Sequence, residues 1–275
     1  LPANMSGFKA KTTAKNYVTL GWSKNASASG YELQQMKNNK WVTIYKPTKN
    51  TVVSYTVKNL KAGTATKFRI RAKKGSVYST YTEFTAVTKP TNVSGFKKKT
   101  ATSTAITLQW NKNTSATGYE VQQYKNKKWT TIRKVSSNST VTLSVSGLKA
   151  GTNYSFRIRA YKTVGKNTQY SGYTNYTAMT LPANMSGFKA KTTAKNYVTL
   201  GWSKNSSATG YEIQRFNGKK WVSVTKVTKN STVSYKVSKL SKNTSYQFRI
   251  RAYKTIGKNT QYSAWSKLTV RTKSK

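Results

Sequence analysis

The sequence lacks three residue types that most catalytic and metal-binding sites require. It contains no His, no Asp and no Cys, and its only acids are four Glu. Without these residues there is no imidazole base, no Ser-His-Asp arrangement, no thiolate nucleophile and no disulfide. We therefore expect a chain that is not an enzyme, needs no cofactor or metal ion, and has no small-molecule substrate.

Long hydrophobic runs are also absent. Apolar residues make up 36% of the sequence, and the lack of any run of about 18 of them predicts no membrane-spanning helix. The low apolar fraction favours several small cores over one large core. We expect no signal peptide within these residues, and the opening Leu1-Pro2-Ala3-Asn4 recurs at Leu181–Asn184. We therefore expect a monomeric fragment that begins at a repeat boundary of a larger protein.

Negative charge is scarce, whereas positive charge is abundant. Lys and Arg number 50 against four acids, which gives a net charge of +46. Self-repulsion at this density destabilises a compact state, so the surface either serves solubility or meets a polyanion that offsets the repulsion. Six of the nine Arg fall in one recurrent tripeptide. The remaining surface charge is nearly all Lys, whose hydrated point charge suits diffuse attraction.

Internal repetition indicates the domain organisation. Residues 1–25 and 181–205 are identical, and a diverged copy lies between them. The equivalent Trp22, Trp110 and Trp202 are 88 and then 92 residues apart, a spacing that is typical of whole domains and not of solenoid repeats. Short linkers that contain Pro restrict the chain and predict an extended array. We predict three domains, called the first, second and third repeat: residues 1–88, 89–180 and 181–275.

Apolar and polar residues alternate within each repeat. Val18, Leu20 and Trp22 form one such run, and Phe68 and Ile70 belong to another. This period of two, interrupted by turns rich in Lys, Asn, Gly and Ser, predicts antiparallel strands with one buried face. About seven strands per repeat and no helical period predict an all-β chain of three tandem β-sandwiches.

Three motifs in fixed order resemble the fibronectin type III domain. They are a strand that ends in Trp22, a Gly-Tyr-Glu strand at Gly30–Leu33, and a Leu-Lys-Ala-Gly-Thr-Asn-Tyr corner that begins at Leu148. The resemblance covers essentially the whole chain, three times over, and implies immunoglobulin-like sandwiches. It also implies that Tyr154 and Tyr246 form tyrosine corners, in which the hydroxyl binds nearby backbone.

The first repeat departs from this pattern at one position. Thr66 stands where the other repeats have the corner tyrosine. A threonine side chain neither fills the same space nor reaches as far. We therefore predict that the first repeat is the least stable of the three.

The resemblance further implies a structural ladder on an outer face of each repeat. Each Arg-Ile-Arg tripeptide points both Arg outward, and the recurrent Glu points outward on a neighbouring strand, so these charges should pair. The aromatic residues of Tyr78–Tyr81, Tyr170–Tyr173 and Tyr262–Trp265 resemble those that stack on arginines in cytokine-receptor members. Direct ligand contact is the alternative. The predicted ladder residues are Glu32, Arg69, Arg71, Glu120, Arg157, Arg159, Glu212, Arg249 and Arg251.

Catalysis by paired carboxylates is not expected. Three Glu occupy one equivalent position in the repeats, and only the first repeat holds a second acid, Glu83. Glycoside hydrolysis requires two carboxylates that flank one bond. No phosphate-binding loop, dinucleotide fingerprint or Arg-Gly-Asp tripeptide occurs either.

Lysines near predicted turns are the candidates for contact with a polyanion. Such turns are followed by Trp41, Trp129 and Trp221. Each Trp side chain either stacks on a sugar or base or covers the sheet edge or the stems of neighbouring lysines, and we favour the second interpretation. We expect Lys162–Asn167 and its copy Lys254–Asn259 to be loops that join the last two strands. The candidate residues are Lys97, Lys98, Lys99, Lys125, Lys127, Lys128, Lys162, Lys166, Lys219, Lys220, Lys254 and Lys258.

These observations lead to one principal hypothesis. The chain is a spacer and attachment module of a bacterial surface or secreted protein, extracellular or associated with the cell wall. Its lysines hold it to anionic polymers such as teichoic acid or anionic glycans, because charge is spread over every repeat. Binding of extracellular DNA is a second hypothesis that the charge supports. An adhesin that recognises a specific host or bacterial protein is a third, and it requires an apolar patch that the sequence does not disclose.

Overall fold

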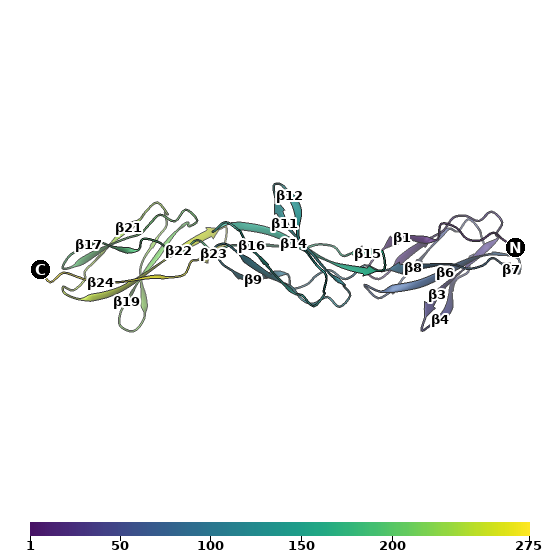
Figure 1. The fold of residues 1–275 in the computed structure, drawn as a ribbon, viewed down its shortest axis with the longest axis horizontal. Coiled ribbons are helices and arrows are strands. Elements are labelled where there is room, and N and C mark those ends of the chain that lie inside the picture. Colours follow the sequence, from purple (N-terminus) through teal and green to yellow (C-terminus); the bar gives the residue numbers. More distant parts are fainter. The chain divides into compact units, whose positions relative to one another are not determined.

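The computed structural model describes residues 1–275 as an all-β chain (Figure 1). Its strands form six antiparallel sheets, two in each repeat. No segment forms a helix with the length and apolar character needed to cross a membrane. Each repeat is a β-sandwich of one three-stranded and one five-stranded sheet.

The first repeat contains eight strands. They are β1 (Lys9–Thr13), β2 (Val18–Gly21), β3 (Gly30–Lys37), β4 (Lys40–Tyr45), β5 (Ser54–Val57), β6 (Ala65–Lys74), β7 (Val77–Tyr78) and β8 (Thr82–Val87). The smaller sheet has the order β1-β2-β5. The larger has the order β4-β3-β6-β7, and β8 also pairs with β6.

The second repeat reproduces this arrangement. Its strands are β9 (Lys97–Ala101), β10 (Ile106–Gln109), β11 (Gly118–Lys125), β12 (Lys128–Val135), β13 (Thr142–Val145), β14 (Asn153–Val164), β15 (Asn167–Tyr170) and β16 (Thr174–Met179). The sheet orders are β13-β10-β9 and β12-β11-β14-β15, and β16 also pairs with β14.

The third repeat has the same topology. Its strands are β17 (Lys189–Thr193), β18 (Tyr197–Gly201), β19 (Gly210–Phe216), β20 (Trp221–Val227), β21 (Ser234–Ser238), β22 (Ser245–Ile256), β23 (Asn259–Tyr262) and β24 (Ser266–Arg271). The sheet orders are β17-β18-β21 and β20-β19-β22-β23, and β24 also pairs with β22.

The alternating apolar residues form the core of each sandwich. In the first repeat, Leu20 and Phe68 are fully buried in one cluster with Trp22 and Tyr31. The ring of Trp22 meets that of Tyr31 edge-on, with centroids 5.6 Å apart. The Tyr31 hydroxyl accepts a hydrogen bond from the Asn25 backbone NH at 2.9 Å, so the one polar atom of this buried ring is satisfied.

Each repeat has eight strands where the sequence predicted about seven. The difference arises at Ser79, whose Oγ accepts a hydrogen bond from the Ala72 NH at 2.9 Å. The Ser79 NH in turn donates to the Ala72 carbonyl at 3.0 Å. This local exchange interrupts the last strand and divides it into β7 and β8. Ser171 and Ser263 make the same contacts with Ala160 and Ala252.

The corner tyrosines contact the backbone that precedes them. The Tyr154 hydroxyl accepts a hydrogen bond from the Lys149 NH at 2.7 Å, and the Tyr246 hydroxyl accepts one from the Ser241 NH at 2.8 Å. Thr66 is half-buried at the equivalent place in β6. The first repeat therefore has no phenolic hydroxyl at this corner.

Candidate functional site

One carboxylate and one arginine face each other on the larger sheet of every repeat, and the carboxylate is buried in the first two repeats and half-buried in the third. Glu32 on β3 is in register with Arg71 on β6, and the Arg71 Nε donates to the carboxylate at 2.6 Å. Only 4% of the Glu32 surface is exposed. The equivalent Nε–carboxylate distances are 3.1 Å for Arg159 with Glu120 and 2.9 Å for Arg251 with Glu212.

The other arginine of each tripeptide has a different partner. Arg69 donates its Nε–H to the side-chain oxygen of Gln34 at 2.8 Å. Arg157 with Gln122 and Arg249 with Gln214 repeat this bond at 2.8 Å. The Glu is therefore hydrogen-bonded to one arginine of each tripeptide, and the Gln to the other. Gln34 lies two residues after Glu32 on the same face of the strand, and sequence reasoning missed it.

Aromatic rings and guanidinium groups alternate in a column above this sheet. In the first repeat the Arg69 guanidinium lies 4.4 Å from the Trp41 ring centre and 3.8 Å from that of Tyr81. The Arg71 guanidinium lies 4.5 Å from Tyr81 and 3.9 Å from Tyr78. Such contacts are favourable when cation and ring face are both shielded from water.

The other two repeats contain the same alternating column. The order is ring, guanidinium, ring, guanidinium, ring. The members are Trp129, Arg157, Tyr173, Arg159 and Tyr170 in the second repeat, and Trp221, Arg249, Trp265, Arg251 and Tyr262 in the third.

The column also accounts for the tryptophans that follow the lysine-rich turns. Trp41 is in register with Met36, which places it on the same face of the sheet as Glu32 and Gln34. One face of its ring is occupied by Arg69. The sequence led us to expect lysine stems or a sheet edge as its neighbour, whereas the structure places an arginine there. The strand parity of Trp41 is the signal that could have shown this.

Contacts within the column shift the pKa values of some of its residues. Burial alone would raise the pKa of the Glu32 carboxyl. Hydrogen bonds from Tyr81, Lys46 and Arg71, together with the charge of Arg71, outweigh burial and lower this pKa from 4.5 to about 2. Burial and the hydrogen bond to Glu32 raise the pKa of the Tyr81 hydroxyl. The Glu32 carboxyl is therefore ionised at neutral pH.

The second and third repeats show related effects. Burial and the hydrogen bond to Glu120 raise the pKa of the Tyr173 hydroxyl. Burial, followed by the like charge of Arg251, lowers the pKa of Arg249. Trp265 replaces the tyrosine that donates to the carboxylate in the other two repeats, so Glu212 has no phenolic donor of that kind.

Three candidate lysines gather at the tip of one hairpin. Lys125 ends β11 and Lys128 begins β12, and the turn between them consists of Asn126 and Lys127 with φ of 49° and 61°. Two successive positive φ values are typical of a type I′ hairpin turn. All three lysines are exposed, and the hairpin extends beyond the rest of its repeat (Figure 1). Lys219 and Lys220 lie in the equivalent turn of the third repeat, after Gly218 with φ of 92°.

The segments expected to be loops after Lys162 and Lys254 are shorter than predicted. Lys162 lies within β14 and Lys254 within β22, and both are half-buried. Only the two residues Gly165 and Lys166 separate β14 from β15, and Gly165 has φ of 56°. Lys166 is therefore at a hairpin tip, as is Lys258 in the third repeat. These turns join β14 to β15 and β22 to β23, where β15 and β23 are the first parts of the divided last strand.

The cluster Lys97 to Lys99 forms the start of strand β9 and is not a loop. This strand is at the edge of the sheet β13-β10-β9. Lys97 and Lys99 are exposed, whereas Lys98 is half-buried. Lysines on an edge strand discourage pairing with a second sheet, which gives this cluster a structural role besides any binding role.

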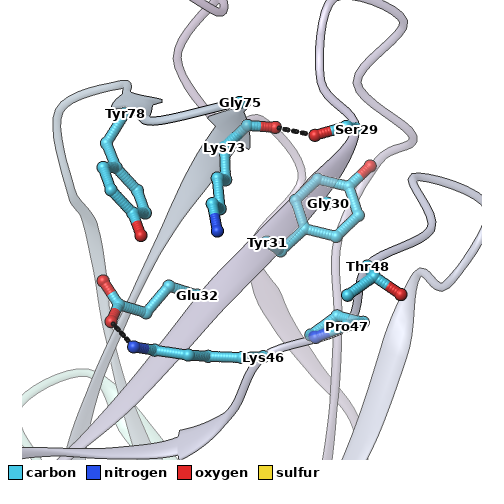
Figure 2. Close-up of a pocket in the computed structure, with 10 residues that line it drawn as sticks. All are labelled: Ser29, Gly30, Tyr31, Glu32, Lys46, Pro47, Thr48, Lys73, Gly75 and Tyr78. Carbon is cyan, nitrogen blue, oxygen red and sulfur yellow. Dashed lines mark hydrogen bonds and ion pairs between the residues drawn. The ribbon is translucent and has the colours of Figure 1, made fainter.

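The first repeat contains a hollow of about 410 Å³ beside the ladder. Figure 2 shows its walls, which include Gly30, Lys46, Pro47, Lys73 and Tyr78. The charged ends of Lys46 and Lys73 and the carboxylate of Glu32 face the same space. Sequence reasoning missed this hollow, because it depends on which residue of β6 lies opposite Gly30.

Curated relatives with similar sequences are longer than this chain. Exoglucanase B of Cellulomonas fimi is 24% identical over 98% of this chain and 26% of that protein. Endoglucanase B of Cellulomonas fimi is 26% identical over 86% of this chain and 24% of that protein. Chitinase A1 of Niallia circulans is 32% identical over 57% of this chain and 22% of that protein. The chain thus spans about a quarter of the length of these relatives.

Solved structures with similar folds include two from chicken. The CNTN1 FN1-FN3 domains are 17% identical and match 98% of this chain and 99% of that one, with a TM-score of 0.35. A two-domain fibronectin type III segment of tenascin is 20% identical and matches 66% of this chain and 99% of that one, with a TM-score of 0.45.

A family model matches two segments of the chain. The model of the fibronectin type III domain matches residues 88–176 and 183–269, which is more than half of the sequence. The first repeat has the same eight-strand topology and shares residues 1–25 with the third. The chain belongs to the fibronectin type III domain family.

Proposed function

We propose that the chain is a non-catalytic spacer and attachment module of a secreted bacterial protein. Its lysines bind anionic polymers such as teichoic acid or anionic glycans by diffuse electrostatic attraction. The observation that carries this proposal is the excess of 50 Lys and Arg over four acids, combined with the engagement of the recurrent acids inside the ladders.

The distribution of charge supports diffuse binding. The candidate lysines at exposed positions lie at hairpin tips in the second and third repeats and on the edge strand β9. Six arginines already have ring faces and side-chain oxygens as partners, so they add little to an external site. A flexible polymer can contact dispersed lysines one at a time, and each contact releases a counterion.

The proposed spacer role is based on the ion pairs of the acids and on the names and lengths of the similar proteins. Glu32 is buried and ion-paired with Arg71 and Lys46, and the exposed Glu83 is the only other acid in its repeat. The relatives are named as glucanases and a chitinase, and the chain spans about a quarter of each. We infer that the full-length protein acts on or near extracellular glycans and that any catalytic domain lies outside this segment.

The test is a salt titration of binding to immobilised teichoic acid. The logarithm of the affinity should fall linearly with the logarithm of the salt concentration, because several counterions are released together. Affinity that survives near-molar salt would contradict diffuse binding. Purified DNA is the competitor at physiological salt, and a clear preference for DNA would favour the nucleic-acid hypothesis instead.

Matched double variants separate diffuse binding from a single site. Three exposed lysine pairs are each replaced by Gln: Lys127 with Lys128, Lys219 with Lys220, and Lys97 with Lys99. Diffuse binding predicts similar losses of affinity and similar decreases in the salt slope for all three variants. If one pair removes most of the affinity and the other two remove none, the site is local.

A further inference from the structure

A tyrosine covers a bare glycine in the second repeat. Tyr161 is in register with Gly118, and a Cβ placed on Gly118 would lie 2.7 Å from the tyrosine hydroxyl oxygen. That hydroxyl donates to the Val135 carbonyl at 3.1 Å. The Lys134 ammonium lies 4.9 Å from the ring centre, and the Tyr170 ring is 6.1 Å away. The side chain is only 5% exposed.

The third repeat contains the same arrangement. Tyr253 is in register with Gly210, and its hydroxyl donates to the Val227 carbonyl at 3.3 Å. The Lys226 ammonium lies 4.6 Å from the ring centre, and the Tyr262 ring is 6.4 Å away. Two independent repeats thus show which groups surround a phenol at this position.

The first repeat keeps the surrounding groups but lacks the ring. The residue in register with Gly30 is Lys73, which is exposed. Pro47 supplies the equivalent carbonyl, Lys46 the equivalent ammonium and Tyr78 the equivalent neighbouring ring. All five residues line the hollow of about 410 Å³ (Figure 2).

The groups around this space have other contacts or remain available. The Pro47 carbonyl accepts a hydrogen bond from the Tyr31 NH at 3.0 Å, and its second lone pair has no phenolic donor. The Lys46 ammonium, which has no ring to face, forms an ion pair with Glu32 at 3.1 Å. A carbonyl oxygen has two acceptor positions, so one more donor fits here.

We propose that this hollow binds a phenolic ring supplied from outside the chain. The ring lies flat over Gly30, its hydroxyl donates to the Pro47 carbonyl, and Lys46 and Tyr78 border it as their counterparts border Tyr161. The ligand is either a small phenolic compound or a tyrosine side chain of another polypeptide. This inference goes beyond the proposed polyanion binding and does not depend on it.

The lining favours a phenol over other ligand classes. The lining carries one carboxylate, Glu32, and two ammonium groups, Lys46 and Lys73, and Lys46 is ion-paired with Glu32, so ligand selection rests on shape and hydrogen bonding. The glycine floor accepts a flat ring closely, because no Cβ stands in the way. The second lone pair of the Pro47 carbonyl can accept a hydrogen bond from a donor, which a phenol supplies and toluene lacks. A concave site with an apolar floor and a few placed polar groups is typical of small-ligand sites.

The test is an NMR titration of the isotope-labelled full chain with p-cresol. Saturable shifts of the Gly30, Glu32 and Thr48 amides are expected, with no comparable shifts at Gly118 and Gly210, where a tyrosine already fills the space. Toluene should give weaker shifts. Equal shifts in all three repeats, or no saturable shift at all, would overturn the proposal.

Two substitutions of one residue provide the matched control. Lys73→Tyr should fill the hollow and abolish the p-cresol shifts, whereas Lys73→Ala should retain them because it leaves the space open. Binding that persists in Lys73→Tyr, or that is lost equally in both variants, contradicts the proposal. Both substitutions are at an exposed position, so folding should be preserved.

The source of the ring is distinguished by a second ligand. N-acetyltyrosinamide presents the same phenol with peptide groups attached. Tighter binding of this ligand than of p-cresol indicates a tyrosine from a polypeptide, and the reverse order indicates a small phenolic compound. Failure of both ligands to shift the Gly30 amide refutes the site, while teichoic acid binding is measured separately and is unaffected.

Discussion

Arg71 and Glu32 lie opposite each other on adjacent strands, and the guanidinium is enclosed by the carboxylate at its edge and by tyrosine rings at its faces. The pair therefore has few contacts left for an external ligand. Removing one partner of a shielded ion pair leaves the other charge uncompensated. The ladder is thus a stabilising element of each sandwich, and its contribution can be measured one residue at a time.

Replacement of the buried acid should destabilise the first repeat alone. Glu32→Gln keeps the shape of the side chain but leaves Arg71 and Lys46 without a counter-charge, and we expect a loss of about 2 kcal/mol. Hydrogen exchange of peptides from β3 and β6 in the full chain measures it. Glu83→Gln is the control, since Glu83 is exposed and should change stability by less than about 0.5 kcal/mol. Equal effects of the two variants would contradict a stabilising role of the Glu32 carboxylate.

Acid should weaken the first repeat through the same carboxyl. The folded-state pKa of Glu32 is depressed from 4.5 to about 2, so its contribution is fully present above pH 4.5 and is lost as the pH falls to about 2. The shift sets an upper limit of about 3 kcal/mol. Urea midpoints of the first repeat at several pH values measure the loss. In Glu32→Gln this part of the pH dependence of stability should vanish. An unchanged pH dependence would show that Glu32 is not its source.

The corner tyrosines should set the order in which the repeats unfold. Tyr154→Phe and Tyr246→Phe each remove a hydrogen bond to backbone and should cost about 1 kcal/mol in their own repeat. The first repeat has Thr66 at this position and should lose hydrogen-exchange protection at the lowest urea concentration. Loss of protection in the first repeat after the other two would show that other contacts outweigh the missing corner.

A glycine in the hairpin turn between β11 and β12 should stabilise the second repeat. Lys127 has φ of 61°, a conformation that costs a residue with a Cβ roughly 1 kcal/mol and costs glycine little. Lys127→Gly should therefore stabilise the second repeat by up to about 1 kcal/mol. Lys125→Gly, which places glycine at the last residue of strand β11, is the matched control and should destabilise. Thermal denaturation of the full chain reports both changes, and the same sign for both would contradict the turn assignment.

Much of the fold follows from patterns that are local in sequence. The identical residues 1–25 and 181–205 and the alternation around Leu20 and Phe68 specify tandem β-sandwiches, because a strand with a period of two buries one face. The same alternation places the Arg-Ile-Arg tripeptides and the recurrent Glu on outward faces. These features need no knowledge of strand register.

The remaining features depend on register between distant strands. Gln34 binds Arg69 and Trp41 stacks on it because β3, β4 and β6 align at those residues, and no short motif encodes this alignment. The division of the last strand follows from a hydrogen bond between Ser79 and Ala72. The hollow depends on the pairing of Gly30 with Lys73, since a lysine there is unremarkable unless its place opposite a glycine is known.

The alternating column has a mechanical consequence. Its rings come from different strands: Trp41 from β4, Tyr78 from β7, and Tyr81 from the segment that precedes β8, while both guanidinium groups come from β6. The column therefore ties four neighbouring segments together through side chains, in parallel with the backbone hydrogen bonds. Under tension the last strand cannot be peeled from β6 until the ring of Tyr81 leaves its two arginines. The sheet should thus resist shear because side chains from several strands hold it together.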